Sequence, residues 1–215
     1  NKEAQTAMAP KNKFTRDEMV QAALRVVRAG GIHSLTAKAL ADELGTSTQP
    51  VFTCFSTMDT LRGEVRTAAQ VMFDSYIDRG LNEPIPFFGV GMQQLRFART
   101  EPQLYRLLFL TGEDNGTLAA MQRMQDAVRP AIMRIYRLDE TAANRYFRDL
   151  WLVGHSLATL IVTGECPYSE REIAAILTGF SVSVYQAIRR IPGFVENSYD
   201  RDAVFRALIG EGEQP

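Results

Sequence analysis

The stretch Leu35–Leu61, LTAKALADELGTSTQPVFTCFSTMDTL, decides how this sequence is interpreted. Its first part places small and apolar residues at the spacing i, i+3, i+4, i+7, which predicts a short amphipathic helix. These residues are Ala37, Leu40, Ala41 and Leu44. Thr36 is expected to cap this helix at its amino end, and Gly45 to end it.

Two further helices are predicted in the same stretch. Ser47 is expected to cap a very short one, with Pro50 in its first turn, where a missing N–H costs nothing. Ser56 together with Asp59 is expected to cap the next, which continues to about residue 80. Two short helices joined by a glycine turn have the layout of a helix-turn-helix, which places its second helix in the DNA major groove.

The residue types suggest which side chains hold this motif together and which contact DNA. Ala41 suits a close contact between helices, and Gly45 suits the turn. Val51 and Phe55 suit a buried core. The polar candidates for DNA contacts are Thr36, Lys38, Thr46, Ser47, Thr48, Gln49 and Thr53. A glutamine such as Gln49 can bond adenine N6 and N7 bidentately. Spacing alone leaves a second interpretation equally open, namely a helical hairpin with a solvated polar turn.

Cations near the motif are candidates for contacts with phosphates or the minor groove. They are Lys38 and, further toward the amino end, Lys11, Lys13 and Arg16. Residues 1–66 hold nine Lys/Arg and seven Asp/Glu, while the remainder of the chain holds fifteen and eighteen. The net charge of the chain is −1, so the position of individual cations must carry any argument for DNA binding.

Outward from this stretch the pattern remains helical. Thr15 and Glu18 form a predicted capping box for a helix that ends at Gly30-Gly31. Further helices are expected at about 87–100, 103–111, 117–136, 140–164, 170–190 and 200–209, and Pro130 should kink or split the third of these. The strongest break in the pattern is 82–86, with two prolines. Period-2 alternation is missing over any useful length, so the predicted fold class is all-α.

Several bulk features narrow the class of protein. Cys54 and Cys166 lack metal-site or disulfide-framework spacing, which favours reduced thiols and a cytoplasmic location. A signal peptide is not expected, and the apolar run Leu150–Thr163 is too short to span a bilayer, so no membrane partner is expected. Met8 is a candidate native start, and residues 1–13 are interpreted as a disordered arm or a cloning remnant.

With these motifs in place, the sequence resembles the TetR family of transcriptional regulators over about Phe14–Val65. The resemblance rests on four motifs in order: Ala22-Ala23 with Val26 and Gly30; L-T-x-x-x-L-A-x-x-L-G at Leu35–Gly45; S-T-x-P-V-F-x-x-F at Ser47–Phe55; and Asp59 with Leu61. It implies a helix-turn-helix domain at 14–61 and a larger effector-binding and dimerisation domain at 62–215, connected by the helix at about 57–80. It also implies a homodimer on palindromic double-stranded operator DNA.

Two positions depart from the family pattern. Phe52 stands where the family usually has a tyrosine whose hydroxyl contacts a phosphate. Met58 stands where a lysine commonly begins the fourth helix. Both changes remove phosphate contacts, so a shallow salt dependence of DNA binding is expected.

The last two long helices are candidates for a dimer interface. Small residues recur along them: Gly154, Ala158, Ala175, Gly179, Ser183 and Ala187. Such residues allow helices to approach closely, either within one subunit or between two. The family resemblance favours a four-helix interface between two copies, and the W-x-x-x-H-S-x-A-x-L segment Trp151–Leu160 looks like a motif found there in many members.

Most of the aromatic and methionine side chains spread over several helices are expected to be ordinary core, but such side chains can also line an apolar effector pocket. The candidates are Phe88, Met92, Tyr105, Phe109, Met124, Phe147, Trp151 and His155. The resemblance makes a small apolar or aromatic effector the expected ligand.

The sequence favours a regulator over an enzyme. Gly154-His155-Ser156 lacks the pattern of a nucleophile elbow, a two-histidine metal pair is missing, and so is a phosphate-binding loop. We therefore predict no metal, cofactor or catalytic residue. The expected function is ligand-modulated transcriptional repression. The alternative is a helical adaptor of the same fold that binds a protein partner in place of DNA.

Overall fold

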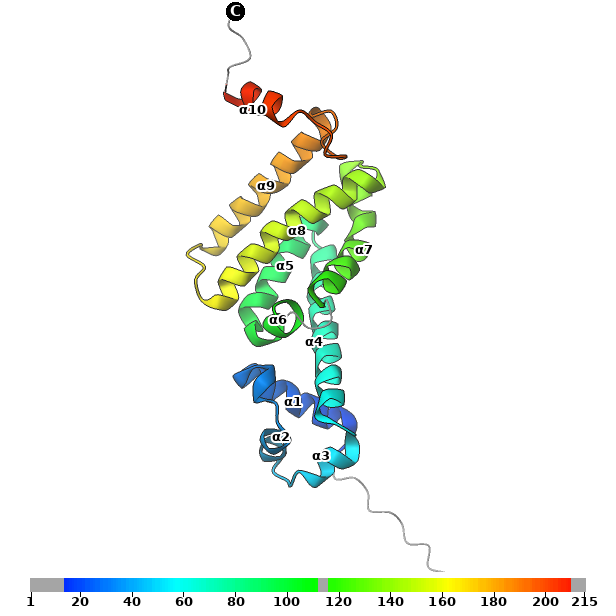
Figure 1. Ribbon diagram of the computed structural model, residues 1–215, viewed down its shortest axis with the longest axis vertical. Helices are drawn as coiled ribbons and strands as arrows, with labels where there is room; N and C mark the ends of the chain where they lie inside the picture. Colours follow the sequence, from blue (N-terminus) through cyan, green and yellow to red (C-terminus); the bar gives the residue numbers. More distant parts are fainter. Residues whose placement is uncertain (1–13, 112–115, 210–215) are drawn as a thin grey trace, which may run out of the picture. The chain divides into compact units, whose positions relative to one another are not determined.

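The computed structural model describes residues 14–111 and 116–209, and its regular structure over these residues is entirely helical (Figure 1). The helices are α1 (Arg16–Gly30), the 3-10 turn η1 (Ile32–Ser34), α2 (Ala37–Leu44), α3 (Gln49–Cys54), α4 (Met58–Leu81), α5 (Pro86–Thr100), α6 (Pro102–Phe109), α7 (Gly116–Tyr136), α8 (Glu140–Thr163), α9 (Glu170–Arg190) and α10 (Arg201–Ile209). The predicted all-α class is confirmed.

The chain forms two compact units that divide inside α4, between Val71 and Met72. The first unit contains α1, η1, α2, α3 and the beginning of α4, and the second contains the remaining helices. The division thus precedes the segment 82–86, in which the sequence pattern has its strongest break. The reason is that α4 continues as one helix through both units.

The first unit is a small helical domain around one apolar core. The capping box of Thr15 and Glu18 is present, and Gly31 ends α1 with a φ of 79°. The Thr36 hydroxyl accepts a hydrogen bond from the N–H of Ala39 and caps α2 as expected. Side chains that are almost fully buried come from α1, α2, α3 and the start of α4: Met19, Leu24, Val27, Leu40, Val51, Phe55 and Leu61.

Two predicted caps are one residue out of register. The residue before α3 is Thr48, not Ser47, and its side chain makes no capping bond. Instead, its carbonyl accepts from Val51 and Phe52. At the start of α4, the Thr57 hydroxyl accepts from the Thr60 N–H at 3.1 Å, so Thr57 is the cap in place of Ser56.

In the second unit α8 is the central helix, and it packs against α5, α7 and α9 (Figure 1). Its amino end is capped by Asp139 and its carboxyl end by Gly164 in the left-handed conformation. α9 begins with a capping box of Ser169 and Glu172. α7 is not split at Pro130, because it runs as one helix from Gly116 to Tyr136.

Aromatic side chains form much of the core of this unit. Phe73 contacts Phe97 and Phe109 edge to face, with ring centroids 5.2 and 5.0 Å apart. Pairs of this geometry contribute about 0.5–1.5 kcal/mol beyond the area they bury. They connect the second half of α4 to α5 and α6. Among the described residues, no helix is long and apolar enough to cross a membrane.

Candidate functional site

The turn between α2 and α3 has the geometry that the sequence predicted for a helix-turn-helix. Gly45 adopts a left-handed conformation with φ of 63°, and its N–H bonds the last carbonyls of α2. The N–H of Thr46 donates to the carbonyl of Ala41 at 2.9 Å. Val51 and Phe55 are 0% and 1% exposed, so they fix one face of α3 in the core.

The opposite side of this motif carries the predicted polar row. Lys38, Ser47, Thr48, Gln49 and Thr53 are all exposed, whereas Thr46 is half-buried. Thr36 is exposed too, although its hydroxyl already serves as the cap of α2. The Thr53 hydroxyl donates to the carbonyl of Gln49 at 3.0 Å, which leaves its oxygen able to accept. The exposed side of α3 therefore carries the amide of Gln49 and the hydroxyl of Thr53, and Thr48 directly precedes the helix.

Arg16 has a different role from the one expected. Its guanidinium bonds the carboxylate of Glu64, donates to the carbonyl of Cys54 at 2.8 Å and lies 4.5 Å above the ring of Phe55. The side chain thus joins α1 to the end of α3 and to α4, so the expectation that it meets a phosphate is not supported. Lys11 and Lys13 lie outside the described residues.

Other arginines of the first unit are also paired with carboxylates. Arg25 bonds Glu43 at 2.5 Å, and Arg62 bonds Asp59 at 2.8 Å. Phe52 is 55% exposed, so this surface carries an apolar ring where a phenol would offer a hydroxyl. These arginines therefore do not give the exposed surface of the first unit a strong positive charge.

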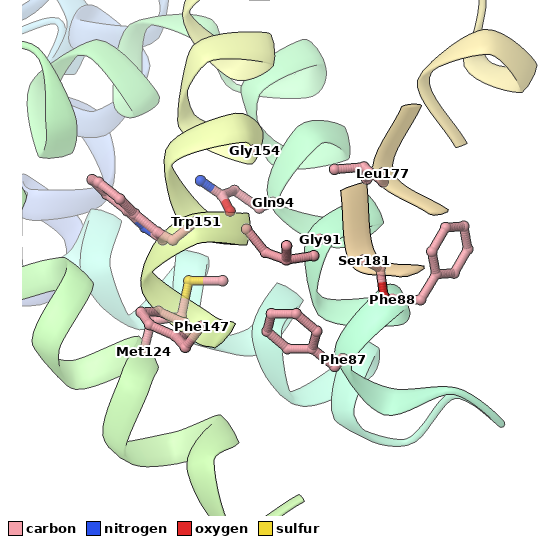
Figure 2. A pocket seen from close by; sticks show the side chains of 11 residues that line it. Phe87, Phe88, Gly91, Gln94, Met124, Phe147, Trp151, Gly154, Leu177 and Ser181 are labelled. Atoms are coloured by element: carbon pink, nitrogen blue, oxygen red, sulfur yellow. The ribbon is translucent and has the colours of Figure 1, made fainter. Parts of the chain in front are cut away.

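The second unit contains a cavity between α5, α7, α8 and α9, with a volume of about 30 Å³ (Figure 2). It is lined by Phe87, Phe88, Gly91, Gln94, Met124, Phe147, Leu150, Trp151, Gly154, Leu177 and Ser181. Four of the predicted pocket residues are among these, namely Phe88, Met124, Phe147 and Trp151. A cavity of this size holds a water molecule or two, so a larger ligand requires side chains to move.

The other predicted pocket residues do not line the cavity. Met92 lines a separate pocket with Leu95 and Ile173. Tyr105, Phe109 and His155 form an aromatic group beside the cavity, where the Tyr105 hydroxyl bonds His155 Nδ1 at 3.0 Å. His155 also stacks on Trp151, with ring centroids 4.8 Å apart.

The sequence interpretation missed several lining residues. Gln94 is 1% exposed, and the amide pair Gln93-Gln94 beside apolar residues of α5 was a usable signal. Leu177 and Ser181 come from the inner side of α9, which was assigned only to the dimer interface. Gly91 has no side chain whose chemistry could have identified it.

The small residues proposed for a dimer interface separate into two groups. Ala158 is fully buried, and Gly154 is buried too, where an added Cβ would lie 3.4 Å from the amide oxygen of Gln94. These two residues cannot face a second copy, because α8 turns this side toward α5. Ala175, Gly179 and Ser183 are exposed on α9, and Ala187 is half-buried. Exposed apolar side chains beside them on α9 are Phe180 and Val182.

The surroundings of His155 predict an effect of pH on stability. Burial lowers the pKa of His155, so the folded state favours the neutral ring. This contribution is complete above the unfolded pKa of about 6.5 and is lost as the pH falls through that value toward the lower folded pKa. We expect the urea midpoint to fall between about pH 7.5 and about pH 5.5, and to fall clearly less in His155→Phe.

The control for this measurement is His33→Phe, because His33 is the only other histidine and is exposed. Glu18 and Glu172 have lowered pKa values through their capping bonds, so they titrate below this pH range. An equal loss of stability in wild type and His155→Phe would contradict the attribution of this pH dependence to His155.

Comparison with solved structures identifies the fold. A TetR-family member from Streptomyces coelicolor A3 superposes with a TM-score of 0.57 and 22% identity, over 80% of this chain and 98% of the other. A protein from Mesorhizobium loti MAFF303099, assigned to the TetR family of transcriptional regulators, gives 0.51 and 19%, over 81% and 97%. No family model matches the chain, and no curated protein matches its sequence. The chain therefore has the TetR-like fold.

Proposed function

We propose that the first unit binds double-stranded DNA sequence-specifically, with α3 in the major groove. The observation that carries this proposal is that Val51 of α3 and Phe55 directly after it are buried, while Gln49 and Thr53 of the same helix are exposed. A polar helix face held rigidly by its apolar side suits direct reading of base edges.

We further propose that the protein is a homodimer on a palindromic operator. Two copies would place two α3 helices about one helical turn of DNA apart. The exposed part of the predicted interface, Ala175, Gly179 and Ser183 with Phe180 and Val182, supports a contact through α9. A contact of small residues and half-exposed apolar side chains matches the character of subunit interfaces.

We propose that the second unit binds a small apolar effector, which releases the protein from its operator. The protein would then act as a repressor. We propose that it does so in the cytoplasm. The effector must bind the released state better than the DNA-bound state. A coupling free energy of about 1–3 kcal/mol changes the affinity for DNA roughly 5- to 150-fold. The cavity between α5, α7, α8 and α9 is the candidate site.

Selection from a random duplex pool, with nonspecific competitor DNA present, tests the proposal. Enrichment of a palindromic sequence would support a dimeric, sequence-specific DNA-binding regulator. Absence of enrichment would overturn it and favour the helical adaptor, whose exposed Phe52 would then be part of a protein contact.

The dependence of operator affinity on salt should be shallow. Arg16, Arg25 and Arg62 are paired with carboxylates and Met58 carries no charge, so few cations are available to neutralise phosphates. Met58→Lys adds one cation at the start of α4 and should steepen the slope of log K against log salt by about 0.9. Phe52→Tyr adds no charge and serves as the matched control, with an unchanged slope. A steep slope for wild type that Met58→Lys does not change would contradict the prediction that wild type makes few phosphate contacts.

A further inference from the structure

Among the residues that the structure describes, those lining the α5–α7–α8–α9 cavity include no ionisable side chain. Its eleven residues are aromatic, aliphatic or methionine side chains, two glycines, one amide and one hydroxyl. A charged ligand placed there would lose its hydration and gain no counter-charge. The cavity therefore selects against acids and amines that are charged at neutral pH.

Trp151 supplies a hydrogen-bond donor that is not used within the described residues. The side chain is 6% exposed and forms part of the cavity wall. Its indole nitrogen is buried and has no partner among the residues that the structure describes. In Figure 2 the nitrogen lies on the ring edge turned toward Met124 and Phe147. Because an indole can donate but not accept, only an acceptor can satisfy it.

Contacts behind the wall hold this donor in place. The Gln94 amide donates to the Tyr105 hydroxyl at 3.5 Å, and that hydroxyl bonds His155 Nδ1 at 3.0 Å. His155 in turn stacks on Trp151 at an interplanar angle of 7°. The indole plane is thus fixed by side chains from three helices, and a fixed donor loses little freedom when a ligand binds.

The rings around the cavity indicate the shape of the ligand. Phe87, Phe147 and Trp151 present aromatic surfaces from two helices (Figure 2). Flat ligands stack well on such surfaces. The side chains that can make room for a ligand are Met124, which is unbranched, and Phe88, which is half-buried.

We propose that this cavity binds an uncharged, planar aromatic compound that carries a carbonyl-type oxygen, and that the Trp151 indole N–H donates to that oxygen. This proposal narrows the effector class of the proposed function and rests on it for the regulatory role. The binding itself can be measured without DNA.

Calorimetric titration with three matched probes tests the proposal: acetylnaphthalene, isopropenylnaphthalene and naphthoate. They share the ring system, but only the first is an uncharged ketone. We expect acetylnaphthalene to bind roughly 3- to 10-fold more tightly than isopropenylnaphthalene, since one hydrogen bond separates them. Naphthoate should bind more weakly than either. In Trp151→Phe the preference for the ketone over the alkene should disappear.

Leu152→Ala is the matched control, because Leu152 is the exposed neighbour of Trp151 on α8 and lines no part of the cavity. This variant should retain the preference. No binding of any probe, equal binding of naphthoate, or an unchanged preference in Trp151→Phe would each overturn the proposal. The comparison of probes on wild type does not depend on whether the variant folds. Duplex selection reports separately on the proposed function, so the two failures are distinguishable.

Discussion

Replacing Gln49 with alanine should weaken binding to the selected operator roughly 5- to 150-fold, which corresponds to the loss of one bidentate contact with adenine, about 1–3 kcal/mol. Gln49 is the first residue of α3, is exposed, and carries the only side-chain amide on this helix. Alanine removes the amide without disturbing the core, because Val51 and Phe55 hold the other side of the helix. Binding to random DNA should change little.

Fluorescence anisotropy with the selected operator and with a scrambled duplex provides the measurement. Gln122→Ala is the matched control, since Gln122 is an exposed glutamine of α7 in the second unit. The sedimentation of Gln49→Ala should match that of wild type. If Gln49→Ala bound the operator as tightly as wild type did, a residue other than Gln49 would have to read the operator.

The helices were predictable because their signals are local. The capping box at Thr15, the cap at Thr36 and the terminal glycine Gly45 act within one helical turn. Register at the short α3 was less well predicted, since either Ser47 or Thr48 is a chemically acceptable residue before it. Both choices lead to the same helix with the same buried face.

The candidate sites were only partly predictable, because they depend on contacts between distant residues. Arg16 looked like a phosphate ligand until Glu64, far along the sequence, was found beside it. As a small residue, Gly154 fitted a helix–helix contact within one subunit or between two, and the family resemblance favoured the latter. Only the packing of α8 on α5 decides, since it places Gly154 against Gln94.

Replacing Gly80 with alanine should destabilise the protein, by about 1–3 kcal/mol in the free energy of unfolding. Gly80 lies near the end of α4, where α4 meets the beginning of α5. A Cβ atom at Gly80 would lie 2.5 Å from the backbone nitrogen of Val90 and 2.7 Å from the carbonyl carbon of Gly89. Backbone atoms cannot rotate away as a side chain can, so the two helices would have to separate.

Gly63→Ala is the matched control, because Gly63 lies in the same helix and a Cβ there would meet nothing within 4 Å. Alanine at this helical position should stabilise by roughly 0.5–1 kcal/mol. Urea denaturation should therefore show a lower free energy of unfolding for Gly80→Ala and a higher one for Gly63→Ala than for wild type. Because α5 also carries Phe87, Phe88 and Gly91 of the cavity wall, a folded Gly80→Ala should also bind acetylnaphthalene with altered affinity. Equal stability of Gly80→Ala and wild type would mean that α4 and α5 do not approach this closely in solution.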